Sequence, residues 1–248
     1  MLQQTQAPRV VAPYERWLGA FPDPPSCASA GPAAALRAWD GLGYNRRGLN
    51  LHRAAVAITE HHGGRVPSGR VELEALPGVG PYTARAVMAF AFEADVGVVD
   101  TNVDRVLRRA VAGQRLGPKE TQVLADRLVP PGQAWAYNQT LFDIGAAHCG
   151  PQPDCVGCPL VSICAWAVGG WRPPDPAASS RRQSGFIGSD RQGRGRLVAA
   201  LRRGPLAPAD LAAASGWQDD PDRAGRVADR LVSDGLASWQ ADGALGLP

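Results

Sequence analysis

The chain has 248 residues, of which 45% are hydrophobic and 20% charged, and its formal net charge is +3. This length allows one large domain or two smaller ones, and so small a basic excess neither requires nor excludes a nucleic-acid partner. We find no apolar run of about 18 residues and no signal-peptide pattern, so we expect a cytoplasmic protein without a membrane partner.

Apolar residues recur at helical spacing through most of the first 168 residues. No long alternating run of Val, Ile, Thr and aromatic residues precedes the last twenty residues, so the strand signal is poor. Residues 1–168 are therefore predicted to form an all-α domain. Its predicted helices cover residues 10–21, 33–39, 51–61, 82–92, 103–111, 119–128 and 133–147.

The C-terminal part of the chain has a different pattern. Residues 169–189 are rich in Pro, Ser and Arg and predict a linker. Helical patterns follow from residue 190, near 207–214 and near 222–234, and the last residues predict a β-hairpin that turns at 241–243. Residues 190–248 are thus predicted to be a small winged-helix-like α+β module. Such modules bind DNA or other proteins, so the pattern leaves its role open.

Four of the five cysteines fall within sixteen residues, with gaps of five, two and five residues between them: Cys149, Cys155, Cys158 and Cys164. A secreted disulfide framework would spread its cysteines over the fold. Thiolates bind soft metals, so zinc and an iron-sulfur cluster are the candidates. Structural zinc usually has two close cysteine pairs, and the wide-narrow-wide spacing favours a [4Fe-4S] cluster. Cys27 stands alone and is predicted to be a small packed or surface residue.

The string LPGVGPYTA, residues 76–84, lies between two helical patterns. Gly78 and Gly80, with Val79 between them, permit a tight turn before a helix. Exposed amides at a helix N-terminus bind anions, so this turn could hold a phosphate, although a Gly-x-Gly between helices is more often only a turn.

A second string, VVDTNVDRV at residues 98–106, places Asp100 after two valines and at the start of a helix. An aspartate there can be a simple helix cap, and it can also face a cleft.

Together these strings and the cysteine loop resemble the helix-hairpin-helix DNA glycosylases that carry a [4Fe-4S] cluster, and most closely the adenine DNA glycosylases. The resemblance covers residues 1–168 and places the cluster loop at 149–164. In that family the cluster is structural and DNA-associated and is not the hydrolytic centre. The first cysteine gap is commonly six residues in the family and is five here.

The resemblance implies roles for three residues. The family's aspartate at the position of Asp100 stabilises positive charge that develops on the sugar as the base leaves, and Asn102 is expected to orient it. At the position of Tyr82 the strand-cleaving relatives have a lysine that forms a Schiff base. The only lysine of this chain, Lys119, lies elsewhere, so we expect a monofunctional glycosylase that uses water.

The first residues, MLQQTQ, and the string GLGY at 41–44 resemble two further signatures of the adenine glycosylases. Residues matching Gln4 and Tyr44 wedge into the duplex around the guanine partner, and Thr5 lies in the same DNA-binding string. An inserted side chain offsets the unstacking of an adenine that must leave the helix. The expected partner is double-stranded DNA with adenine opposite 8-oxoguanine or guanine, bound by a monomer.

Two departures from the family pattern affect the expected activity. The family's general acid is a glutamate placed directly before the Met-Leu-Gln-Gln-Thr string, so we expect either a start codon internal to the gene or a truncated protein with impaired catalysis. Many relatives also carry a C-terminal domain that recognises 8-oxoguanine, and the winged-helix-like module stands in its place here.

Two alternative functions remain open from the sequence. A relative that removes thymine or uracil from mismatches would share the scaffold and differ in the base pocket. A DNA-binding iron-sulfur protein without activity would account for the absent glutamate.

Overall fold

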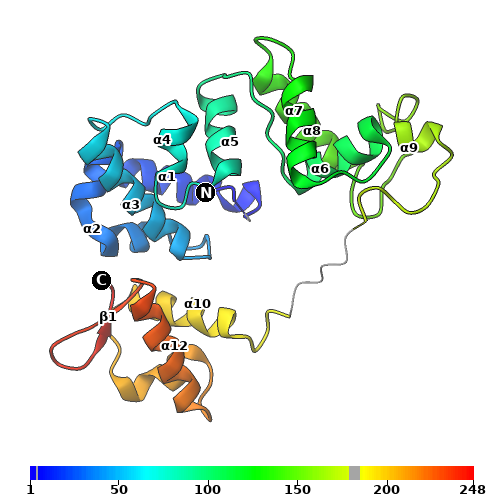
Figure 1. The fold of residues 1–248 in the computed structure, drawn as a ribbon. Helices are drawn as coiled ribbons and strands as arrows, with labels where there is room; N and C mark the ends of the chain where they lie inside the picture. Colours follow the sequence, from blue (N-terminus) through cyan, green and yellow to red (C-terminus); the bar gives the residue numbers. More distant parts are fainter. Residues whose placement is uncertain (4, 179–184) are drawn as a thin grey trace. The chain divides into compact units, whose positions relative to one another are not determined.

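The computed structural model describes residues 1–3, 5–178 and 185–248, and it is mostly helical (Figure 1). The chain forms two compact units. Unit 1 consists of Met1–Pro67, Leu76–Gly78 and Gln183–Pro248, and unit 2 of Ser68–Ala75 and Val79–Arg182. Among the described residues, no helix combines the length and the apolar character that a membrane crossing requires. The domain boundaries expected at 168/169 and 189/190 stay predictions.

The N-terminal part of unit 1 consists of η1 (Ala7–Arg9), α1 (Val11–Ala20), α2 (Pro24–Ala38) and α3 (Arg46–His61). Asp23 caps α2, and its carboxylate accepts the backbone amide of Ser26 at 2.8 Å. α2 is interrupted at Gly31, whose φ of 78° is left-handed. Trp17 and Trp39 meet edge to face in the core, with ring centroids 5.9 Å apart.

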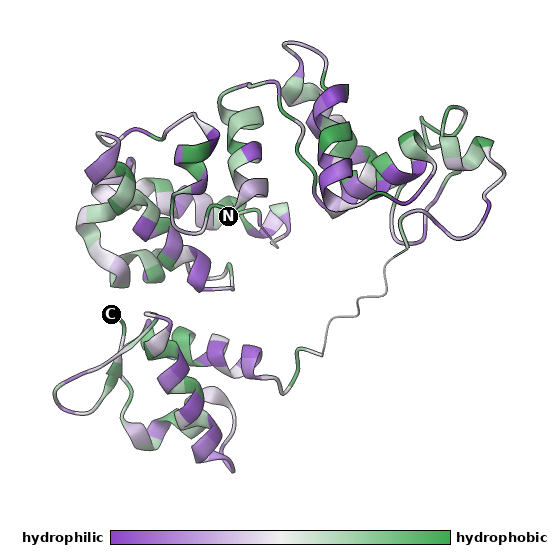
Figure 2. Ribbon diagram, in the orientation of Figure 1, coloured by the Kyte–Doolittle hydropathy of each residue, from purple (hydrophilic) through white to green (hydrophobic). Residues whose placement is uncertain are grey.

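The C-terminal part of unit 1 is the winged-helix-like module. It consists of α10 (Asp190–Leu201), η3 (Pro208–Asp210), α11 (Leu211–Ser215), α12 (Pro221–Ser233), β1 (Ser238–Trp239) and β2 (Leu245–Gly246). The two strands pair antiparallel, with Ser238 opposite Gly246. α12 is amphipathic and carries both hydrophilic and hydrophobic residues (Figure 2). Its buried face is built from Ala224, Val227, Ala228 and Leu231.

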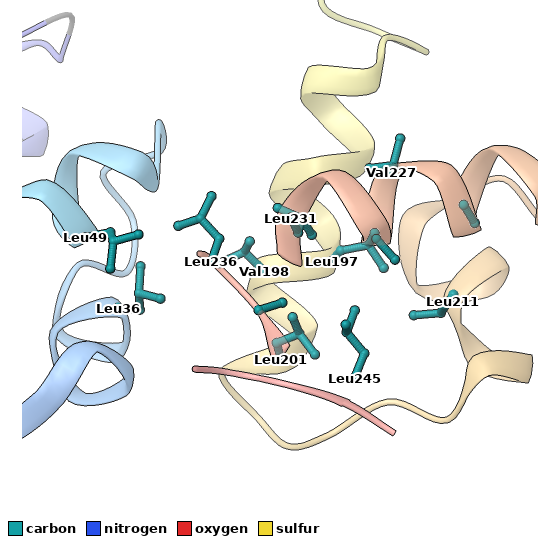
Figure 3. Packing of buried hydrophobic residues seen from close by; sticks show 13 residues of the cluster. Leu36, Leu49, Leu197, Val198, Leu201, Leu211, Val227, Leu231, Leu236 and Leu245 are labelled. Carbon is teal, nitrogen blue, oxygen red and sulfur yellow. The ribbon is translucent and has the colours of Figure 1, made fainter. Parts of the chain in front are cut away.

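The two parts of unit 1 share one hydrophobic core. Leu36 of α2 and Leu49 of α3 are buried in the same cluster as Val198, Leu201 and Leu236 of the module (Figure 3). Leu36 and Leu49 are therefore removed from water by packing against the C-terminal module.

Unit 2 is all-α. Its elements are α4 (Arg70–Glu74), α5 (Pro81–Ala91), α6 (Thr101–Val106), the π-helical η2 (Leu107–Ala112), α7 (Pro118–Leu128), α8 (Ala134–Ala147) and α9 (Ala165–Val168). A core of Val103, Val106, Leu107, Ala125 and Leu141 joins α6, η2, α7 and α8.

A buried asparagine fixes the extended segment that leads into α6. The side-chain oxygen of Asn138 accepts the amide of Val98 at 2.8 Å, and its nitrogen donates to the carbonyl of Val96 at 2.9 Å. Because Asn138 lies on α8, residues 96–98 are bound to that helix just before Asp100.

The all-α class with a small C-terminal strand module is confirmed, and each predicted helix has a counterpart. α3 begins at Arg46, earlier than the predicted residue 51. α4 and α9 were not predicted, because five and four residues are too short to show a helical period.

Candidate active site and cysteine loop

A short helix, a tight turn and a longer helix follow one another at residues 70–91. After α4, Gly78 has a φ of 79°, and Gly80 lies in extended backbone as the N-cap of α5. A Cβ at Gly78 would also lie 2.6 Å from Cβ of Asn50. The turn therefore needs glycine for its backbone angle and for close packing.

The tip of this turn is open to a ligand. Gly78 and Gly80 are exposed and Val79 is half-buried. Gly80 has no side chain with which to cap α5, so an outside anion can accept from the first amides of the helix.

Asp100 is the N-cap of α6. Its Oδ1 accepts the backbone amides of Asn102 and Val103, each at 2.8 Å, and its Oδ2 accepts the side-chain amide of Asn102 at 3.1 Å. The half-buried carboxylate of Asp100 is thus both the cap of α6 and the candidate catalytic group. Capping uses mainly Oδ1 and leaves acceptor capacity on Oδ2.

A chain of hydrogen bonds leads from Asp100 to the cysteine loop. The side-chain oxygen of Asn102 accepts from Nη2 of Arg105. Nε of Arg105 donates to the backbone carbonyl of Cys149 at 2.6 Å, and Nη2 also reaches the carbonyl of Gly145 at 3.4 Å. The orientation of Asn102 is therefore coupled to the position of the first cysteine.

Gly145 lets α8 pass directly against the start of α6. A Cβ at Gly145 would lie 2.7 Å from Cβ of Asn102 and 3.0 Å from its backbone carbon and oxygen. Real side chains do not approach this closely, so only glycine fits here.

Tyr82 lies in the first turn of α5 and is 41% exposed. Burial of part of its side chain raises the pKa of Tyr82, and the charge of the Asp100 carboxylate raises that pKa further. The phenol therefore stays protonated at neutral pH, within electrostatic reach of Asp100.

The four cysteines of the loop line one cavity, together with Val106, Ile144 and Trp166. The cavity holds about 390 Å³ of space without protein atoms, open solvent included. All four thiols are free of disulfides. Burial raises the pKa of the Cys155 thiol, and the three other thiols of the loop raise it further, so these three lie within electrostatic range of Cys155.

No group of three or more described His, Cys, Asp or Glu side chains is arranged to hold a metal ion. The four thiols instead surround a space. A set of soft donors around a largely apolar cavity fits a cluster of several iron atoms better than a single zinc ion.

Arg109 holds the loop from inside. It is 2% exposed and makes two hydrogen bonds to Asp175, from Nε at 2.9 Å and from Nη2 at 2.6 Å. Nη1 donates to the carbonyl of Gly150 at 2.7 Å and reaches Sγ of Cys149 at 3.5 Å. The guanidinium also lies 5.5 Å from the ring centre of Trp166. Arg109 therefore joins η2, the cysteine loop and the start of the predicted linker.

Arg47 organises the N-terminal string that the sequence predicts to bind DNA. Its Nη2 donates to the hydroxyl of Thr5 at 2.7 Å, and its guanidinium lies 5.4 Å from the ring centre of Tyr44. The Thr5 hydroxyl donates to the carbonyl of Leu42 at 3.3 Å. Tyr44 is 50% exposed. Gln4 lies outside the described residues.

The candidate site residues fall into two groups. Asp100, Asn102, Tyr82 and the four cysteines belong to unit 2, while Thr5, Tyr44 and Gly78 belong to unit 1. Sequence reasoning assigned no role to the arginines that connect the members of each group, which are Arg47, Arg105 and Arg109. Their spacing carried a weak signal, since Arg105 and Arg109 are four residues apart on one helical face. The general arginine excess of the chain concealed it.

Comparison with known proteins agrees with this arrangement. Residues 1–131 match the model of the HhH-GPD superfamily of base excision DNA repair proteins. The adenine DNA glycosylase of Mycolicibacterium smegmatis is 41% identical over 254 residues, which cover 100% of this chain and 84% of the relative.

Two solved structures have a similar fold. A thermostable thymine-DNA glycosylase has 30% identity and a TM-score of 0.64, covering 68% of this chain and 80% of its own. A trapped endonuclease III–DNA covalent intermediate has 25% identity and a TM-score of 0.60, covering 68% and 81%. The chain belongs to the HhH-GPD superfamily of base excision DNA repair proteins and is a base-excision DNA glycosylase.

Proposed function

We propose that this glycosylase acts as a monomer on double-stranded DNA and hydrolyses the N-glycosidic bond of adenine mispaired with 8-oxoguanine or guanine. The fixed carboxylate of Asp100 carries the proposal for the reaction, because it is a charged group held by three hydrogen bonds at the start of a helix. The similarity to adenine DNA glycosylases along the whole chain supports adenine as the base.

In the proposed reaction the bond between the sugar and adenine breaks, and its electron pair leaves with the base. The sugar then carries positive charge, which the Asp100 carboxylate stabilises. Water adds its hydroxyl to the sugar carbon and releases one proton. The departing adenine takes up one proton, so the reaction balances. Asn102 holds Oδ2 of Asp100 in one orientation, so little reorganisation is needed as the charge develops.

Tyr82 makes this chemistry monofunctional. A Schiff base needs an amine, and the protonated phenol of Tyr82 has none to offer. The reaction therefore ends with an intact strand that lacks a base.

The proposed DNA contacts come from both units. The open amides after Gly78, Val79 and Gly80 bind a phosphate, and Tyr44, with Thr5 and Gln4, contacts the duplex beside the mismatch. Flipping the adenine costs stacking energy, which an inserted aromatic ring such as that of Tyr44 offsets.

The cysteine loop is proposed to hold a [4Fe-4S] cluster. Cys149, Cys155, Cys158 and Cys164 would be its ligands, since they line one cavity and are all free thiols. When bound, the cluster supplies a rigid cross-link for the loop, with no part in the hydrolysis. Arg109 and Arg105 fix the backbone of the loop around it.

Asp100→Asn tests whether the Asp100 carboxylate stabilises the positive charge that develops on the sugar. The amide oxygen of asparagine can still cap α6, so folding and mismatch binding should persist, while single-turnover release of adenine opposite 8-oxoguanine should slow at least about a hundredfold. Asp104→Asn is the matched control, because Asp104 lies on the same helix and pairs with Arg108 at 2.9 Å. Equal rates for the wild type and Asp100→Asn would refute the role of Asp100. The assay is run both on the 248-residue chain and on a form that includes the in-frame codons before Met1.

Thymine removal is the second candidate, favoured by the structural similarity to a thymine-DNA glycosylase. Duplexes with adenine or thymine opposite guanine separate the two functions in one assay. Release of thymine without release of adenine would replace the proposal. Tight mismatch binding without release of either base would indicate a non-hydrolytic DNA-binding protein.

A further inference from the structure

The loop that joins α2 to α3 has an unusual backbone. Three of its residues have positive φ values, namely 85° at Gly41, 66° at Gly43 and 45° at Tyr44. Glycine tolerates such angles, whereas a tyrosine adopts them only when its surroundings hold it there. The Tyr44 ring is half-exposed and lies against the guanidinium of Arg47, and the two ends of the loop provide further contacts that can fix its backbone.

One arginine of the C-terminal module spans this loop. Nη1 of Arg202 donates to Asp40 at 2.6 Å, before the loop, and Nη2 donates to the side-chain oxygen of Asn45 at 2.7 Å, after it. Nε donates to the carbonyl of Leu36 in α2 at 2.9 Å. The side chain of Arg202 is only 11% exposed. A single planar guanidinium thus connects both ends of the Tyr44 loop.

The module is held against this loop by further contacts. Asp234, at the end of α12, accepts a hydrogen bond from Arg46 at 2.6 Å. Arg46 directly follows Asn45 in the sequence. A Cβ at the next residue, Gly235, would lie 2.7 Å from Nη2 of Arg53 on α3. Beneath these polar contacts, the buried Leu36 and Leu49 pack with the apolar residues of the module (Figure 3).

The charge of the module argues against a general DNA-binding role. Between residues 185 and 248 eight arginines are balanced by eight aspartates. Arg223 and Arg230 pair with Asp190, and Arg194 pairs with Asp234. Nonspecific DNA affinity depends on an excess of free positive charge, and these arginines are engaged within the protein.

We infer that the C-terminal module positions the Tyr44 loop for the mismatched duplex, with Arg202 as the positioning residue. This rests on the proposed function, in which Tyr44 contacts DNA. The similarity to the mycobacterial glycosylase extends through the module, so the two proteins share this part of the chain. The module acts through the geometry of the loop and needs no DNA contact of its own.

The test compares Arg202→Ala with Arg203→Ala in the full chain. Arg203 is exposed and, among the described residues, its side chain donates to the carbonyl of Ala199 near the end of α10, at 3.3 Å, so it is a matched control. In DNA-free protein, amide hydrogen exchange of residues 40–47 should become faster in Arg202→Ala and stay unchanged in Arg203→Ala. Preference for the mismatched over the fully paired duplex should fall roughly tenfold in Arg202→Ala alone. Arg202→Lys, which keeps the charge and loses the fork, should restore only part of that preference.

A double mutant with Tyr44→Ala separates positioning from stability. If Arg202 acts through Tyr44, Arg202→Ala should cause no further loss of mismatch preference in the Tyr44→Ala background. Unchanged exchange of residues 40–47 in Arg202→Ala overturns the inference, as does an undiminished further loss in the double mutant. If the wild type itself shows no mismatch preference, the proposed function fails, and the exchange experiment still decides whether Arg202 holds the loop.

Discussion

Arg105 binds Asn102 and Cys149 with the same guanidinium, which donates from Nη2 to the Asn102 side chain and from Nε to the Cys149 carbonyl at 2.6 Å. Asn102 in turn donates to Oδ2 of Asp100. The candidate acid and the first residue of the cysteine loop are therefore connected through side chains as well as through the core of α6 and α8. A change at the loop should be felt at the acid.

Arg105→Lys should slow base release with little effect on duplex binding. A lysine ammonium lacks the planar fork of donors, so it cannot donate to the Asn102 side chain and the Cys149 carbonyl in the geometry that two guanidinium nitrogens provide. Misplacing a catalytic group by about 1 Å costs up to about a hundredfold in rate, and we expect a loss of roughly tenfold or more. Single-turnover rates and duplex dissociation constants would measure the two effects. Arg127→Ala, an exposed position on α7, serves as the control. A wild-type rate in Arg105→Lys would show that the connection has no catalytic consequence.

Cys158→Ser should remove the visible absorbance of the purified protein. Serine provides no thiolate at neutral pH, so a cluster with four thiolate ligands would lose one of them. Cys27→Ala is the control, because Cys27 is 3% exposed in the core of unit 1 and burial raises the pKa of its thiol to about 11. It should keep the colour and the iron content of the wild type. Equal iron content in Cys158→Ser and the wild type would argue against the cluster.

The local pattern of the chain predicted its elements well and their connections poorly. Periodicity located the main helices, and the Gly-x-Gly turn and the Asp100 cap lie where short-range chemistry requires them. Arg109 and Asp175 illustrate the limit. Asp175 falls in a proline-rich stretch that predicts a linker, yet it accepts two hydrogen bonds from a buried arginine 66 positions earlier. Neither residue has a local reason to be special, because their pairing exists only once the cysteine loop has folded between them.

Asp175→Asn should destabilise unit 2, since it leaves the buried Arg109 guanidinium without its carboxylate. Breaking a buried ion pair by removing one partner typically costs about 3–5 kcal/mol, and the partial exposure of Asp175 favours the lower end of that range. Urea unfolding followed by circular dichroism at pH 7 would measure the loss. Asp154→Asn is the control, as Asp154 lies in the neighbouring cysteine loop, where its carboxylate accepts the amide of Val156 at 3.1 Å and, among the described residues, pairs with no arginine.

The same pair predicts a pH dependence. Hydrogen bonds from Arg109 lower the pKa of Asp175 below its ordinary value, against the opposing effect of burial. A carboxylate whose pKa is lowered by folding contributes stability above its unfolded pKa of about 3.9, and this contribution is lost as the pH falls through the folded pKa. The stability difference between wild type and Asp175→Asn should therefore stay constant from pH 7 to about pH 5 and shrink below about pH 4. A difference that grows on acidification would contradict the assignment.

Gly145→Ala should both destabilise the protein and slow base release. The new methyl would lie 2.7 Å from Cβ of Asn102, so α8 and the start of α6 must move apart. Because Asn102 donates to the Asp100 carboxylate, that carboxylate is displaced as well. Overpacking of this kind costs about 1–3 kcal/mol.

Gly225→Ala is the informative counterpart, because Gly225 lies within α12 and a Cβ there would meet nothing within 4 Å. Alanine at that helical position should stabilise the protein by about 0.4–1 kcal/mol and leave base release unchanged. Opposite signs for the two substitutions, measured by thermal unfolding and single-turnover release, would show that Gly145 is needed for the close approach to Asn102. If Gly145→Ala were as harmless as Gly225→Ala, the approach of α8 to Asn102 would have no part in holding Asp100.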